Sequence, residues 1–289
     1  MYKTAIVTDT NSGLLPEEAE HLGIHLVPMP VIVDEESFFE YVSITQADFF
    51  ARLKGGAAVS TSQPSPGALL SCWDALLETH DNLVYIPMSS SLSGEYQTAA
   101  MLAEDYDGRV HVADTHRISV TQRQAALDAL HWVQQEKSAA EIKAYLEHDG
   151  RNSDIFIAVN TLELLKKSGR VTAAGAALGS ILSIKPVLRI QGGKLDAYRK
   201  VRGMRAAIQA MIEGLQADLQ QLDCPQVMLR AAYAGDCAAG IAWQAALQES
   251  FPECTVGLDP LPLSVCCHVG YGALGVGIAK DILTEGDAI

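Results

Sequence analysis

The first half of the chain alternates between short apolar runs and longer segments with the spacing of a helix. Apolar runs at Ala5–Val7, Leu83–Met88 and Val110–Ala113 predict buried strands. A helix is predicted to begin after Ser65, because serine is a favoured N-cap and Pro66 suits the first turn. Strands that alternate with helices are typical of a mostly parallel, doubly wound α/β sheet.

The second half of the chain has a different pattern. Runs at Pro186–Ile190 and Lys194–Val201 flank Gln191-Gly192-Gly193, which predicts a β-hairpin. A further strand is predicted at Ser264–His268 and a closing helix near Val276–Leu283. A hairpin combined with crossover helices indicates a mixed or antiparallel sheet layered with helices.

The change of pattern predicts two domains. We place the boundary near residue 150, at Asp149-Gly150-Arg151-Asn152, which separates an N-terminal α/β domain (1–150) from a C-terminal α/β domain (151–289). The expected fold class is therefore α/β, with a parallel doubly wound sheet followed by a mixed one.

Composition narrows the function classes. The 289 residues are 48% hydrophobic with a formal net charge of −14, which argues against nucleic acid or an anionic membrane surface as the main partner. Met1–Ile6 has no secretory pattern and no apolar run approaches the length of a bilayer span. We expect a cytoplasmic protein without stable membrane insertion. No spacing of histidine, cysteine or carboxylate residues indicates a metal site.

Basic residues nevertheless gather in two stretches of this acidic chain. They are Lys166, Lys167 and Arg170, followed by Lys194, Arg199, Lys200, Arg202 and Arg205. Two interpretations stay open: a local patch that attracts anions, or ordinary solvated surface residues.

Two polar loops precede predicted helices and carry the strongest chemical signal. Thr61-Ser62-Gln63-Pro64-Ser65-Pro66-Gly67 leads into one helix, and Ser89-Ser90-Ser91-Leu92-Ser93-Gly94 follows a strand and leads into the next. Hydroxyls and free N–H groups at a helix N-terminus suit an anion. Ligands of α/β sheets usually bind at the carboxyl ends of strands. Both loops could converge on one carboxylate or phosphate, although simple capping by Ser65 and by Ser93 explains part of each.

Other patterns compete for the same residues. Ser93, His268 and an aspartate would supply a hydrolase triad, but the G-x-S-x-G elbow is missing. The run from Gly270 to Gly275 fits G-x-G-x-x-G, yet the chain ends before a further βαβ unit, so a dinucleotide site is not expected.

Taken together, the chain resembles the DegV family of fatty-acid-binding proteins along nearly its whole length. The order and spacing of several segments carry the resemblance: Ile6-Val7-Thr8-Asp9-Thr10, Thr61-Ser62-Gln63-Pro64-Ser65-Pro66, Leu92-Ser93-Gly94-Glu95-Tyr96-Gln97, Ser168-Gly169-Arg170-Val171, Ile184-Lys185-Pro186, Lys200-Val201-Arg202-Gly203 and His268-Val269-Gly270-Tyr271-Gly272-Ala273-Leu274-Gly275. The chain departs from the family pattern at Glu95, Ser168, Val269 and Tyr271. Glu95 would bring an acid to the helix expected to face the ligand, and Tyr271 would reshape the pocket mouth.

The resemblance implies a protein that binds a long-chain fatty acid such as palmitate between its domains and is not an enzyme. The acid is the ligand, and no cofactor is expected. The resemblance assigns Ser62 and Ser93 to the carboxylate, with a surrounding shell of Thr61, Gly94, Arg202 and His268. It also implies a separate fatty-acid kinase as a possible partner, docking near Arg170, Lys166 and Lys167.

A different function class stays open beside this one. A small-molecule phosphotransferase or a serine hydrolase would use the same polar cluster. A phosphotransferase would need a nucleotide site, and the sequence has no G-x-x-x-x-G-K-[ST] loop.

Overall fold

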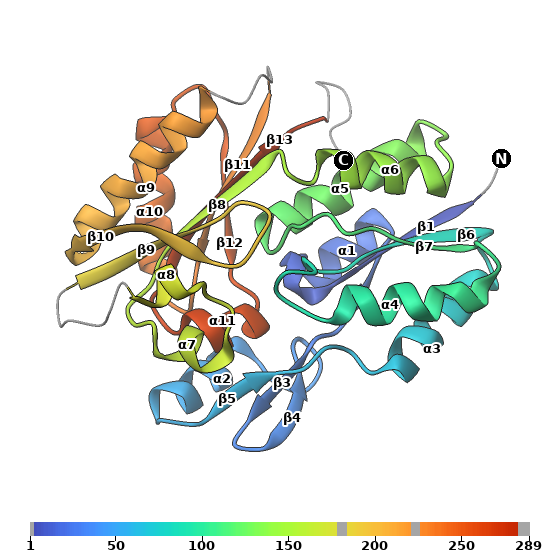
Figure 1. Ribbon diagram of the computed structural model, residues 1–289, viewed down its shortest axis with the longest axis horizontal. Helices are drawn as coiled ribbons and strands as arrows, with labels where there is room; N and C mark the ends of the chain where they lie inside the picture. The colour runs from blue at the N-terminus through green and yellow to red at the C-terminus, as the bar shows by residue number, and fades with distance from the viewer. Residues whose placement is uncertain (1–2, 178–183, 221–225, 283–289) are drawn as a thin grey trace.

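A computed structural model describes residues 3–177, 184–220 and 226–282 (Figure 1). Its first sheet is parallel throughout, with the order β2-β1-β6-β7. The strands are β1 (Thr4–Asp9), β2 (Ile24–Val27), β6 (Asn82–Ile86) and β7 (Val110–Val112).

Helices cover both faces of this sheet. Alternate side chains of β1 and β6 point to opposite faces. One face packs against α1 (Pro16–Leu22), α5 (Val120–Gln134) and α6 (Ala139–Asp149). The other packs against α3 (Pro66–Leu77) and α4 (Glu95–Ala103). Short 3₁₀ turns follow β1 at Thr10–Ser12 and α4 at Glu104–Tyr106. The predicted doubly wound parallel sheet is confirmed.

The second sheet has six strands in the order β10-β9-β8-β13-β11-β12. Only β11 and β12 pair in parallel; the other neighbours are antiparallel. Its strands are β8 (Ser153–Ala158), β9 (Ile184–Ile190), β10 (Asp196–Arg202), β11 (Val227–Tyr233), β12 (Val256–Pro260) and β13 (Leu274–Lys280). The predicted mixed sheet is confirmed, and β9 and β10 form the predicted hairpin.

The two faces of the six-stranded sheet meet different partners. One face packs against α9 (Gly203–Leu219) and α10 (Cys237–Ser250) through Phe156, Met211, Trp243 and their neighbours. The opposite face carries Ile155 and looks toward the rest of the molecule, where α7 (Glu163–Ser168) and α11 (Leu263–Val269) pack. The short helix α8 (Ala173–Ala177) lies beside β10.

A small third sheet was not indicated by the sequence patterns. It consists of β3 (Pro30–Val33), β4 (Glu36–Phe39) and β5 (Val59–Thr61), with α2 (Gln46–Lys54) between β4 and β5 in the chain. Its residues Val31 and Phe38 join one hydrophobic core with Leu162 and Leu263 from the second half of the chain. The third sheet therefore ties the two halves together along the lower edge of Figure 1.

Two predictions near the end of the chain were wrong. Ser264–His268, predicted as a strand, lies in helix α11, and Leu274–Lys280 forms strand β13 where a helix was expected from Val276; Leu283 lies outside the described residues. Fully buried apolar runs do not show whether they are helix or strand. Contacts with residues distant in the sequence determine which of these two segments is a helix and which is a strand. The buried carboxylate of Glu40 accepts the N–H of Leu263 at 2.9 Å and so caps α11.

The segment 149–152, where the sequence analysis places the domain boundary, comprises the last residue of α6 and the three residues that connect it to β8. Within the three described ranges, no helix is both long enough and apolar enough to cross a membrane.

Candidate functional site

A cavity of about 860 Å³, a volume that includes open solvent at its mouth, lies where the two halves of the molecule meet. Strands β8, β9, β11 and β13 of the six-stranded sheet, β5 of the third sheet and helix α11 supply much of its wall, and the parallel sheet contributes the turn and loops that follow β1, β2 and β6.

Most of the cavity wall is aliphatic. Ile118 and Val120 come from the start of α5, and Ile155 and Ile157 come from β8. The remaining large apolar side chains are Met29, Met88, Leu92, Leu165, Ile190, Leu195, Leu261, Val265, Val269 and Val276. A wall of this composition suits an aliphatic ligand, because burying its surface removes it from water.

Five of the side chains with hydrogen-bonding groups that line the same cavity are here called the polar cluster: Thr61, Ser62, Ser93, Arg170 and His268. The Thr61 hydroxyl lies 3.0 Å from His268 Nε2, so β5 and α11 are joined at this point. Hydroxyl, imidazole and guanidinium groups of this kind can bind a carboxylate or phosphate.

The two serine-bearing loops do come together, as their positions before α3 and α4 led us to expect. Gln63, next to Ser62, donates a 2.9 Å hydrogen bond to the hydroxyl of Thr98 in α4. Its side-chain oxygen also lies so close to Gly94 that a Cβ there would come within 3.3 Å of it. The loop that carries Ser62 is thus fastened to the helix that follows Ser93.

The capping assignment for Ser93 was wrong in detail. Helix α4 begins at Glu95 with Gly94 as its N-cap residue. The Ser93 hydroxyl still accepts the N–H of Glu95 at 3.1 Å. This bond uses one lone pair and leaves the hydroxyl proton available to a ligand.

His268 is neutral in this environment. Burial, with a smaller contribution from the positive charge of Arg170, lowers the pKa of His268 to about 4. Its Nδ1 is buried and has no hydrogen-bond partner among the described residues. A neutral imidazole can donate or accept one hydrogen bond to a ligand without adding charge to the cavity.

Arg170 is the single charged side chain of the lining residues, which include no aspartate, glutamate or lysine in the described part of the chain. Its Nε donates to the carbonyl of Leu92 at 3.4 Å, which places the guanidinium beside the Ser93 loop. The local balance of charge in the cavity is therefore positive, although the whole protein is acidic.

Ser93 and Arg170 lie at the mouth of the cavity. Both also line an outer groove of about 540 Å³, together with Leu92 and the more polar set Ser90, Ser91, Gly94, Gln97, Ser168, Gly169 and Lys194. Ser93 and Arg170 thus mark the end of the cavity nearest to this surface.

Two buried acids lie beneath the polar loops rather than in the cavity. Asp9 accepts the N–H groups of Asn11 and Met88, each at 2.7 Å, and burial raises its pKa to about 6. Glu95 accepts the hydroxyl of Tyr85, and burial together with the nearby Asp9 raises the pKa of Glu95 well above its usual range. Both acids support the loops that carry cavity residues.

This arrangement corrects the expectation for Glu95 and Tyr271. Glu95 is fully buried under α4 and is not a lining residue, so it does not place an acid against the ligand. Tyr271 is also absent from the lining; its ring packs edge-on against Phe50, and Lys54 lies 3.7 Å from its centre.

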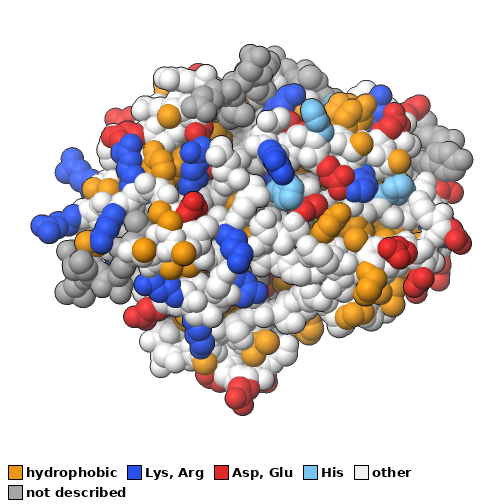
Figure 2. Space-filling model, in the orientation of Figure 1, with side chains coloured by type: hydrophobic (Ala, Val, Ile, Leu, Met, Phe, Trp, Pro, Cys, Tyr) orange, Lys and Arg blue, Asp and Glu red, His pale blue; other side chains and the backbone are white. Residues whose placement is uncertain are grey.

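The remaining sequence-predicted residues are distributed as follows. Gly94 lies in the outer groove, and Arg202 is exposed at the end of β10, an edge strand, away from the cavity lining. Lys166 and Lys167 are exposed on α7, whereas Arg170 turns into the cavity. Figure 2 shows the blue Lys and Arg side chains gathered mainly over the left half of this face, where β9, β10 and α7 lie.

Sequence reasoning missed four polar lining residues: Asn11, Gln63, Ser119 and Ser264. Asn11 follows the carboxyl end of β1 at the same sheet edge as the Ser89–Gly94 loop, which is a signal that was available. Ser264 bonds to Asn11 across the seam at 2.5 Å, a contact that only the tertiary fold reveals.

The described geometry does not form a serine hydrolase triad. Among the described residues, no hydrogen bond joins Ser93 to His268, since His268 Nε2 pairs with Thr61. The Nδ1 atom, which a carboxylate would orient in a triad, has no partner there.

Comparison with known proteins agrees with this architecture. A family model described as an uncharacterised protein of the DegV family matches residues 3–281. A DegV domain-containing protein of Deinococcus radiodurans is 32% identical over 275 residues, covering 95% of this chain and 97% of the relative. A similar protein of Listeria monocytogenes is 31% identical over 277 residues, with 95% and 97% covered.

Solved structures show the same fold. A DegV family protein from Thermus thermophilus, described as fatty acid binding, superposes with a TM-score of 0.88 at 28% identity, covering 96% of this chain and 99% of that one. DegV of Bacillus subtilis, described as a fatty acid binding protein, gives 0.85 at 25% identity, with 97% and 100% covered. The chain therefore belongs to the DegV family.

Proposed function

We propose that this protein binds one long-chain fatty acid in the cavity between its two halves, with the carboxylate at the polar cluster and the tail along the aliphatic wall. The observation that carries the proposal is the composition of the lining: an aliphatic wall, nine side chains with hydrogen-bonding groups of which one is a cation, and no acid among the described residues. Relatives from Thermus thermophilus and Bacillus subtilis described as fatty acid binding support the ligand class.

The energetics favour a binder whose affinity comes from the tail. Each buried methylene contributes about 0.8 kcal/mol, so a dozen supply on the order of 10 kcal/mol before the costs of association. The polar cluster adds orientation. Arg170 balances the negative charge of the carboxylate, and neutral His268 with the serine and threonine hydroxyls supplies hydrogen bonds.

We also propose that the acid is carried and presented without being changed. Ser93 and Arg170 line both the cavity and the outer groove, so a bound carboxylate would be the part of the ligand nearest the surface. Exposed Lys166 and Lys167 lie on α7, which immediately precedes Arg170, and would favour an acidic docking surface on a partner. A fatty-acid kinase that phosphorylates the presented carboxylate fits this arrangement.

The two proposed domains supply different parts of the cavity wall. Residues 1–150 supply both serine loops and the start of α5, and residues 151–289 supply the β8 and β9 wall, Arg170 and His268. Binding would thus depend on both proposed domains.

Titration calorimetry of the delipidated protein with palmitic acid and with hexadecanol tests the proposal. Palmitic acid is expected to bind one to one and more tightly than the alcohol, since only the acid engages Arg170 as an ion. Mass spectrometry of the recovered ligand should return unchanged acid. Failure of palmitic acid to bind, or equal affinity for the alcohol, would refute the assignment.

The presentation step has its own test. Lys166→Glu with Lys167→Glu is expected to leave palmitate affinity unchanged while slowing acyl phosphate formation by a fatty-acid kinase with ATP. If the double variant formed acyl phosphate at an unchanged rate, these lysines would have no role in docking the kinase.

A further inference from the structure

Helix α5 is buried on nearly every side although its first turns are polar. Thr121, Gln122, Gln124 and Asp128 are all buried, and the helix contacts strands of both large sheets. Buried polar groups require hydrogen-bond partners in specific places. Gln122 bonds to Thr8 and to Ile86 in the parallel sheet, whereas Gln124 reaches Asp281 after β13 at 3.4 Å. Helix α5 therefore lies in the seam between the halves, as Figure 1 shows.

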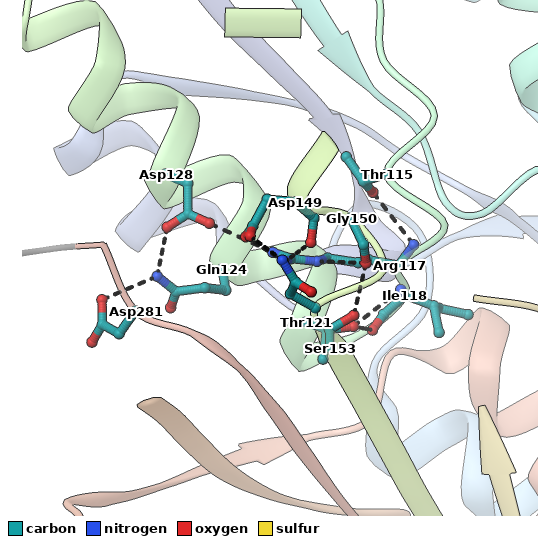
Figure 3. Close-up of polar contacts among 11 residues, drawn as sticks. Thr115, Arg117, Ile118, Thr121, Gln124, Asp128, Asp149, Gly150, Ser153 and Asp281 are labelled. Atoms are coloured by element: carbon teal, nitrogen blue, oxygen red, sulfur yellow. Dashed lines mark hydrogen bonds and ion pairs between the residues drawn. The ribbon is translucent and has the colours of Figure 1, made fainter. Parts of the chain in front are cut away.

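Arg117, just before α5, is the centre of the polar contacts at this seam (Figure 3). It is 2% exposed. Its guanidinium donates to the carbonyl of Gly150 at 3.3 Å and to the carbonyl and carboxylate of Asp149, each at 3.0 Å. A fourth contact, to Asp128 in α5, is 3.5 Å long. Such a fork with several acceptors in different directions requires the planar, five-donor geometry of arginine.

The contacts of the Arg117 guanidinium join two segments of chain that lie close to each other. One is residues 115–120, which lead from β7 into α5; the other is residues 149–153, which lead from α6 into β8. They lie so close that a Cβ on Gly150 would come within 2.3 Å of the Thr115 carbonyl oxygen. Ser153 strengthens the second segment by donating to the Gly150 carbonyl at 3.0 Å.

Both segments run directly into the walls of the cavity. Ile118, Ser119 and Val120 follow Arg117, and Ile155 and Ile157 follow Ser153. Ser119 has a φ of 54°, which is strained for a residue with a side chain and must be held by its surroundings. Its N–H donates to the carbonyl of Asn11 at 2.9 Å. Arg117 thus restrains two stretches of the cavity wall.

We propose that Arg117 is a positioning residue that latches these two segments and thereby sets the width of the acyl cavity. The inference rests on the proposed binding of a fatty acid, but it concerns a side chain that does not line the cavity. The alternative is that Arg117 only stabilises the fold, like any buried ion pair.

A matched pair of variants separates these two roles. Arg117→Lys keeps the charge but loses the fork. Arg123→Lys, within α5, makes the same change at a fork to Glu18 of α1 that holds two elements of the first half and lies outside the cavity lining. Both variants are expected to lower the melting temperature. Only Arg117→Lys should raise the dissociation rate of palmitate, by about tenfold, because affinity changes within one binding site are mostly changes in dissociation.

Amide exchange of the ligand-free protein gives a second readout. Exchange of the Ser119 amide should become faster in Arg117→Lys and stay unchanged in Arg123→Lys. If Arg117→Lys does not fold, Asp149→Asn can replace it, because this substitution removes one charged acceptor of the Arg117 guanidinium. Palmitate dissociation and Ser119 amide exchange should then both become faster, but by a smaller amount.

Equal changes in the palmitate dissociation rate and in the Ser119 amide exchange rate for Arg117→Lys and Arg123→Lys would refute the positioning role of Arg117. Failure of the proposed function is distinguishable, because the wild-type protein would then bind no palmitate at all. The exchange comparison would still decide whether Arg117 holds the segment.

Discussion

Ser93 combines two tasks that the fold makes compatible. Its hydroxyl accepts the Glu95 N–H, and its position at the cavity mouth leaves the hydroxyl proton free to meet a carboxylate. The loop that holds it is supported from below by Asp9, which binds the Met88 N–H, and by the pair of Glu95 and Tyr85.

Ser93→Ala is expected to weaken palmitate binding by roughly 1–3 kcal/mol, since a desolvated carboxylate would lose a hydrogen-bond donor. Calorimetric titration measures the loss. Ser90→Ala is the matched control, because Ser90 belongs to the same loop but lines only the outer groove. If the two substitutions weakened palmitate binding equally, the assignment of Ser93 to the carboxylate site would be wrong.

The pKa of His268 leads to a pH prediction. Because its pKa is about 4 in the folded protein and about 6.5 in a free chain, the unfolded state binds the extra proton between these values. The contribution of His268 to stability should therefore be intact above pH 6.5 and decline toward pH 4. His268→Gln should remove a pH-dependent difference on the order of 3 kcal/mol across this window. Urea unfolding of both proteins at several pH values checks it; a constant difference would show that His268 titrates normally.

The polar cluster was partly predictable from single residues. Serine loops before helices and after strands pointed to Ser62 and Ser93, because parallel strand ends converge at one sheet edge. Arg170 was assigned to the surface, yet Gly169, with a φ of 69°, reverses the chain after α7 and directs it inward. Arg202 was expected nearby, but the sheet order puts β10 at an edge, and local patterns do not encode that order.

At the scale of elements, helix α5 packs closely against strand β13 because the strand has a glycine at the point of contact. Gly277 in β13 faces the first turn of α5, where a Cβ would come within 2.4 Å of Val120. Absence of a side chain lets the helix lie directly on the strand. This close approach keeps Val120 against the cavity and accounts for the glycine at position 277.

Gly277→Ala is expected to destabilise the protein by about 1–3 kcal/mol, because the added methyl group must displace α5. Gly275→Ala is the control on the same strand, since its Cβ would meet the nearest atom at an ordinary 3.5 Å. Thermal unfolding compares the two. A smaller loss for Gly277→Ala than for Gly275→Ala would contradict the packing described.

The strands and helices of the first half followed from alternation of apolar runs and caps. The last two elements did not, because 263–269 and 274–280 are short, mostly apolar and almost entirely buried, and such runs do not distinguish a helix from a strand. Their assignment depends on Glu40 and α5, which are distant in sequence. The third sheet was missed for a related reason: its strands have three or four residues each.

At the scale of the whole molecule, the acidic protein places its cavity behind a positively charged mouth. Walls from both halves would enclose the tail of a bound acid, so the length of the cavity should set a limit on the ligand. Affinity should rise with each carbon until the cavity is full and then stop rising.

A series of saturated acids from dodecanoic to octadecanoic tests this limit. Affinity is expected to increase by about 0.8 kcal/mol, about fourfold, for each methylene over the lower part of the series. Competition with a fluorescent fatty acid gives the values. Affinity independent of chain length would mean that the tail is not enclosed.

A crystal structure of the delipidated protein after addition of palmitic acid tests the central claim most directly. We expect one acid in the cavity, with its carboxylate within hydrogen-bonding distance of Ser93 and Arg170 and its tail beside Ile155 and Ile190. An acid bound elsewhere, a reversed acid with its carboxylate among the isoleucines, or an unoccupied cavity would contradict the account.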